Sequence, residues 1–190
     1  MSHSVRRSAG LGLAPGLGLA LTLALVSCGS GGGGGGGGPT APQPGLTFTA
    51  ENGSAPAVRL LRGAGSSGTT LEVQVQADQL SGVYGLAFDL SFPPSVLQYD
   101  GSTEGTFLSA GGVDTTLQVA EASPGHLVVG ATRLGDVSAT GGSGQLMTLR
   151  FTGIGAGSGT LSFSMTKVFD NSGKEMRGPS WLGGTVQVTL

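Results

Sequence analysis

Few side chains in this sequence have the types and spacing that enzymatic chemistry requires. His126 is the only histidine beyond His3, and it follows a Ser-Pro-Gly turn where an exposed structural role is expected. No Ser-His-Asp arrangement can be assigned, because any partner would be chosen arbitrarily. The carboxylates are scattered, and spacing along a chain cannot show the pair about 5–9.5 Å apart that a glycosidase needs. We therefore expect no enzyme activity and no catalytic residues.

Residues 170–175, Asp-Asn-Ser-Gly-Lys-Glu, offer the oxygen ligands that calcium prefers. The full EF-hand register is absent, however. A hairpin turn accounts for the same residues, because Asn and Gly tolerate positive φ. The sequence predicts a turn here, with no metal site and no cofactor, and calcium binding is the alternative.

Cys28 is the single cysteine, so neither an intrachain disulfide nor a zinc site with several thiolates can form. Arg6 and Arg7 precede an apolar stretch over residues 11–26, which ends just before Cys28. A basic region, an apolar region and a small-residue cleavage site together indicate a signal peptide over residues 1–27. The alternative is a retained transmembrane helix, for which about 16 apolar residues are short of the roughly 20 needed.

The segment Leu25-Val26-Ser27-Cys28 resembles the lipobox of bacterial lipoproteins. This resemblance implies export, cleavage before Cys28 and lipidation of its thiol, and more than one acyl chain gives stable anchoring in a membrane. Gly29, where an Asp would signal inner-membrane retention, favours the outer membrane if the organism has one. Residues 28–45 are then a lipidated cysteine and a flexible Gly/Pro/Ser linker, with a reach of roughly 20–25 Å.

The composition excludes nucleic acid as a partner. Nine basic and 11 acidic side chains give a net charge of −2, and two of the basic residues, Arg6 and Arg7, belong to the leader. The remainder therefore carries a charge of −4, without the basic clusters that neutralise phosphates. The one domain expected over residues 46–190 is large enough to bury a core without disulfides.

Alternation of apolar and polar residues predicts that this domain is all-β. In residues 70–76, Leu71, Val73 and Val75 share one face, and residues 83–92 repeat the pattern with Phe88 and Leu90 among the heaviest inward side chains. Glycine- and proline-rich turns separate the short segments, which favours a single antiparallel β-sandwich. The other expected strands cover residues 46–49, 57–61, 96–99, 116–120, 127–131, 145–152, 160–166 and 185–190.

Four segments in order resemble the cohesin domain family, a jelly roll of about nine strands: residues 83–97, 126–131, 144–151 and 159–163. The resemblance implies a non-catalytic scaffolding module that binds a protein partner, of dockerin type, and a link to polysaccharide degradation. If the partner is a dockerin, calcium belongs to it. The implied partner-binding face lies on the third, fifth, sixth and eighth strands and maps to Gly85, Ala87, Asp89, Gln118, Val128, Thr148 and Arg150.

The sequence departs from the family pattern at the positions that recognise dockerins. Gly85 and Ala87 stand where hydrogen-bonding side chains are usual, so an unrelated protein partner is also open. A carbohydrate-binding module is the alternative function. Against it, Tyr84 alternates with the core residues and Trp181 is expected to pack in a loop, which leaves too few exposed aromatics for a sugar-stacking strip.

Overall fold

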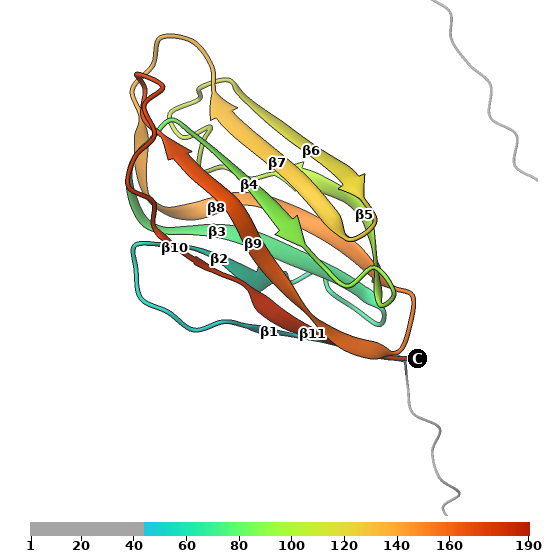
Figure 1. The fold of residues 1–190 in the computed structure, drawn as a ribbon. Helices are drawn as coiled ribbons and strands as arrows, with labels where there is room; N and C mark the ends of the chain where they lie inside the picture. The colour runs from blue at the N-terminus through green and yellow to red at the C-terminus, as the bar shows by residue number, and fades with distance from the viewer. Residues whose placement is uncertain (1–43) are drawn as a thin grey trace, which may run out of the picture. The chain divides into compact units, whose positions relative to one another are not determined.

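The computed structural model describes residues 44–190, which form two β-sheets stacked face to face (Figure 1). One sheet has six strands in the order β1-β11-β9-β4-β7-β6, and the other has five in the order β10-β2-β3-β8-β5. Within these residues there is no helix long and apolar enough to cross a membrane. Residues 1–27 and Cys28, where the sequence predicts a leader and a lipid anchor, lie outside the described part.

Eleven strands make up the two sheets, and all but one of their pairings are antiparallel; β10 runs parallel to β2. The strands are β1 (Gly45–Ala50), β2 (Ala57–Arg62), β3 (Thr70–Val83), β4 (Gly85–Ser91), β5 (Leu97–Glu104), β6 (Thr115–Ser123), β7 (His126–Arg133), β8 (Thr140–Gly153), β9 (Gly157–Phe169), β10 (Ser180–Leu182) and β11 (Gly184–Thr189).

The core lies between the sheets and consists of the inward side chains of both. In β4, Leu86, Phe88 and Leu90 are buried while the residues between them are partly exposed, as the period of two requires. Phe88 packs against Phe163 and Trp181, with ring centroids 5.1 and 5.5 Å away. The alternation in sequence therefore sets which face of each sheet is free for binding.

The predicted β-sandwich is confirmed, with eleven strands instead of about nine. Each segment expected to be a strand overlaps one, although the segment expected over residues 83–92 is divided by a bend at Tyr84. Strands β3, β8 and β9 extend well beyond their predicted ends. The strand that the prediction missed is β10, whose three residues are too few to show a period. Trp181, expected in a loop, is in β10 and is half-buried between Phe88 and Phe163.

A β-bulge changes the register between β4 and β9. Ala87 is opposite Lys167 and Asp89 is opposite Ser164, so β9 carries one extra residue between these pairs. Met165 lies within the bulge, has a φ of 49° and is 71% exposed. Bulges of this kind redirect side chains, and this one presents a methionine to solvent.

Candidate functional site

The outer surface of β6, β7, β4 and β9 is a flat array of mostly small side chains, here called the four-strand face. The strand registers arrange it in rows that cross the four strands. The first row is Thr116, Thr132, Gly85 and Phe169; the second is Gln118, Gly130, Ala87 and Lys167; the third is Ala120, Val128, Asp89 and Ser164.

Charges on the four-strand face are paired locally. Nζ of Lys167 lies 3.2 Å from Oε2 of Glu175, and Nε2 of His126 lies 3.2 Å from Oδ2 of Asp89. His126 is thus a partly exposed residue beside a carboxylate, at the start of β7. Apolar groups are also exposed on the face, because Val128 has 44% of its surface accessible. The face is therefore suited to packing against a protein more than to binding a highly charged ligand.

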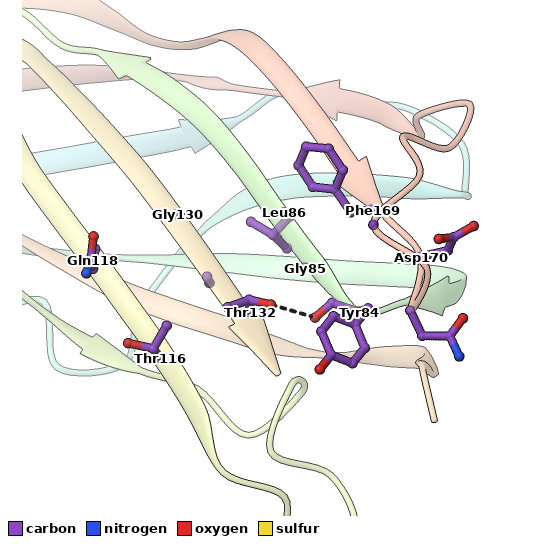
Figure 2. Close-up of a pocket in the computed structure, with 12 residues that line it drawn as sticks. Tyr84, Gly85, Leu86, Thr116, Gln118, Gly130, Thr132, Phe169 and Asp170 are labelled. Atoms are coloured by element: carbon purple, nitrogen blue, oxygen red, sulfur yellow. Dashed lines mark hydrogen bonds between the residues drawn. The ribbon is translucent and has the colours of Figure 1, made fainter. Parts of the chain in front are cut away.

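A hollow of about 490 Å³ lies at one end of the four-strand face (Figure 2). Figure 2 shows Thr116 and Gln118 of β6 at one side and Phe169 and Asp170 at the other. Gly85 and Gly130 line it between them. Its volume falls in the range of about 300–1,000 Å³ that small-ligand sites occupy.

The turn that follows β9 forms one wall of this hollow. Asp170 Oδ1 accepts hydrogen bonds from the Ser172 hydroxyl at 2.6 Å and from the backbone N–H groups of Ser172 and Lys174 at 2.8 and 3.0 Å. The Ser172 hydroxyl bond, then the backbone bonds, and last the Lys174 ammonium lower the pKa of Asp170 from its ordinary 3.8, and desolvation opposes them weakly. Asp170 is therefore a carboxylate at neutral pH.

The same contacts confirm the hairpin turn predicted over residues 170–175. Phe169 is bridged to Glu175, and the backbone N–H of Gly173, with φ of 76°, donates to the Asp170 carbonyl. In the part of the chain that the structure describes, no three His, Cys, Asp or Glu side chains gather as metal ligands would. Asp170 uses Oδ1 to close its own turn.

The seven residues predicted to form one partner-binding face are divided between the two sheets. Five lie together on β4, β6 and β7: Gly85, Ala87, Asp89, Gln118 and Val128.

Thr148 and Arg150 are on β8 instead, between β3 and β5 in the five-stranded sheet. Their side chains line a separate hollow with Glu72 and Asp100. The assignment of these two to the same face was wrong, because alternation shows which side chains share a side of a strand but not which sheet the strand joins. β4 lies between β7 and β9, so Ser162, Ser164 and Lys167 of β9 take the places given to Thr148 and Arg150.

Sequence reasoning also missed most of the hollow. Tyr84 was expected in the core, but it lies in the bend between β3 and β4, where strand alternation does not set its direction. It is half-buried, lines the hollow, and donates its hydroxyl hydrogen bond to the Gly135 carbonyl. Phe169 was missed because the predicted strand ended at Thr166. The β9 bulge also shifts the alternation after Met165, so the pattern in sequence does not show that Phe169 faces outward.

Comparison with known proteins gives one family. The model of the cohesin domain family matches residues 58–188. No curated protein sequence matches the chain significantly.

Several solved structures share the fold at low sequence identity. A type II cohesin domain from the cellulosome of Acetivibrio cellulolyticus is 15% identical, with a TM-score of 0.52 over 77% of this chain and 95% of that one. The type II cohesin–X-dockerin complex of Acetivibrio cellulolyticus matches at 14% identity and 0.51, over 73% and 93%. A cohesin module from a family 33 glycoside hydrolase of Clostridium perfringens matches at 13% and 0.51, over 76% and 95%.

Proposed function

Because the chain belongs to the cohesin domain family, we propose that it is a non-catalytic module that binds a partner protein across the four-strand face. The observation that carries this proposal is the make-up of that face. Its central positions, Ala87 and Gly130, are adjacent in register and lack side chains that would hold a partner away.

The face offers shape more than side-chain hydrogen bonds. Asp89 already faces His126, and Lys167 already faces Glu175, so few polar side chains at the centre of the face are left without a neighbour. Val128 and Met165 provide exposed apolar groups at separate points on the surface. Interfaces gain most of their affinity from a few apolar and aromatic anchors, and methionine adapts to the surface packed against it. A helix of the partner, lying across the strands, is the occupant that this surface fits.

A dockerin is the first partner to test, because the Acetivibrio cellulolyticus relative was solved in complex with one. We measure binding of residues 44–190 to a panel of purified dockerin modules, including any encoded in the same genome, with calcium present and with chelator. The core cluster of these residues runs from Leu46 to Val188, so this part contains the whole core that it needs to fold. Loss of binding with chelator is expected if calcium belongs to the dockerin.

Two substitutions place the interface. Ala87→Arg puts a long cation at the centre of the four-strand face, and we expect at least a tenfold loss of affinity, about 1.4 kcal/mol. Arg150→Glu is the matched control, because it changes charge on the outer side of the opposite sheet. Affinity that falls with Arg150→Glu and not with Ala87→Arg would reject the four-strand face. Binding to insoluble polysaccharide, with no dockerin bound, would favour the carbohydrate-binding alternative. It would also argue against a role in polysaccharide degradation that depends on a dockerin.

We also propose that the module is displayed on the cell envelope by lipid on Cys28, on the outer membrane where one exists. The support is the sequence of residues 1–28 and the Gly-rich linker after it. Metabolic labelling with a fatty-acid analogue should mark the wild-type protein and leave Cys28→Ala unlabelled. Labelling that survives the substitution would remove the anchor from this proposal.

A further inference from the structure

We propose that the hollow at the end of the four-strand face is a pocket for one basic side chain, lysine or arginine, carried by the protein partner. The inference rests on the proposed function and deepens it, since it assigns a chemistry to one end of the face. Three features carry it. Gly130 is a glycine for which the fold gives no reason, Tyr84 and Phe169 line the hollow with aromatic rings, and Asp170 has a carboxylate whose Oδ2 accepts none of the hydrogen bonds of its turn.

Gly130 has no conformational or packing reason to be glycine. Its φ lies outside the left-handed region, and a Cβ built on it would meet no atom within 4 Å. Gly85 differs, because a Cβ there would come within 3.0 Å of Thr132 Oγ1 and 3.2 Å of the Ala131 carbonyl oxygen. Glycine in a strand weakens the strand relative to alanine. The space above Gly130 is therefore kept open without a benefit to the fold, which points to a ligand.

Aromatic side chains border this open space. Phe169 is the partner of Gly85 in register and lines the hollow with it, and Tyr84 directly precedes Gly85 in the chain (Figure 2). The Tyr84 hydroxyl is engaged by Gly135, which fixes one end of its ring. The stem of a long side chain can pack on such rings, and a cation is attracted to their faces.

Asp170 supplies the charge. The hydrogen bonds that the described residues donate to its carboxylate all reach Oδ1, and they hold the group in place in a tight turn. Oδ2 receives none of these bonds and belongs to a residue that lines the hollow. A carboxylate on the wall of the hollow fits a cation, and the net charge of −4 over the domain attracts a basic partner at long range. An acidic side chain is disfavoured by the same charges.

The test uses small probes, because the partner is not identified. Residues 44–190, labelled with ¹⁵N, are titrated with the N-acetyl amides of arginine, lysine, norleucine and glutamate, and amide shifts are followed. We expect saturable shifts around Gly85, Gly130 and Asp170 with the two basic probes, at dissociation constants in the range of ~1 mM or weaker. Norleucine has a similar stem without the charge, so we expect it to bind at least about threefold more weakly.

Two variants separate the stem from the charge. Gly130→Leu fills the hollow without a backbone clash and should abolish saturation with every probe. Asp170→Asn should reduce the preference for the basic probes over norleucine to within about twofold. Equal binding of norleucine and the basic probes, or shifts that persist in Gly130→Leu, would overturn the proposal, as would saturable binding of methyl glucoside in place of the basic probes.

The pocket and the proposed function can be rejected separately. If a dockerin binds the wild type and loses affinity with Ala87→Arg, while the basic probes cause no shifts, the pocket is rejected and the partner-binding face stands. If the basic probes saturate at the hollow and no dockerin in the panel binds, the pocket stands and a dockerin is rejected as the partner.

Discussion

Replacing Arg133 tests how the loop beside β6 is held. Arg133 is 5% exposed and is the one buried charged side chain among residues 44–190. Its Nη1 donates a hydrogen bond to the Leu108 carbonyl, and its Nη2 donates one of 3.2 Å to the Ala110 carbonyl. The loop so fixed also inserts Phe107 and Leu108 into the core. Arg133→Met keeps an apolar stem of similar length and removes both donors.

The magnitude follows from these two bonds. A hydrogen bond to a charged group contributes about 1.5–3 kcal/mol, so the two together contribute about 3–6 kcal/mol. Part of this is offset because methionine has no cation to desolvate, and Nε of Arg133 has no partner among the described residues. We expect a net loss of about 2–4 kcal/mol in the free energy of unfolding. Arg133→Lys should lose less than Arg133→Met, since an ammonium can reach one carbonyl but lacks the planar fork of the guanidinium.

Urea unfolding of residues 44–190 measures this loss, as a shift in midpoint with an unchanged m-value. Arg150→Met is the matched control: it removes an exposed arginine, and we expect a change within about 0.5 kcal/mol. Hydrogen exchange should report the same event locally, as faster exchange in residues 105–114. If Arg133→Met is as stable as the wild type, the cost of burying the cation equals the gain from its bonds, as happens for many buried ion pairs, and the reasoning is refuted.

Three further outcomes can be measured on the same domain. Because the folded state lowers the pKa of Asp170, the contribution of its carboxylate to stability is present above pH 3.8 and is lost as pH falls below it. The difference in free energy of unfolding between the wild type and Asp170→Ala, measured with urea, should therefore shrink in acid. A difference independent of pH would contradict this. Gly105→Ala should destabilise the domain by at least about 1–3 kcal/mol, because the new Cβ would lie 2.1 Å from the Gln145 carbonyl oxygen. Gly130→Ala, with free space around the new Cβ, should stabilise it by about 0.5–1 kcal/mol. Equal effects would show that the space around the two glycines does not decide the outcome. Met165→Gly should be no less stable than the wild type, since its positive φ suits glycine and its side chain is mostly exposed; a clear loss of stability would mean that the methionine packs on the face.

Local pattern was sufficient for most of the secondary structure and for the fold class. Period-two alternation identifies the buried side of β4, and it placed Ala87 and Asp89 correctly on the outer side. It failed at β10, whose three residues are held by parallel pairing with β2, a contact between segments more than a hundred residues apart in sequence. No alternation in so short a segment can report that pairing.

What the sequence determined by itself is which side chains face inward on the longer regular strands, because burial of apolar groups follows the two-residue repeat. It could not show where the β9 bulge shifts that repeat. It also determined the chemistry available: one histidine in the domain, scattered carboxylates and no metal-binding cluster of cysteines. The tertiary structure alone decided which strands are neighbours. Pairing of β4 with β9 brought Phe169 and Asp170 to the end of the sheet at Gly85. Pairing of β8 with β3 and β5 placed Arg150 in the opposite sheet. Strand order depends on long-range packing and chain connection, which no local repeat in the sequence encodes.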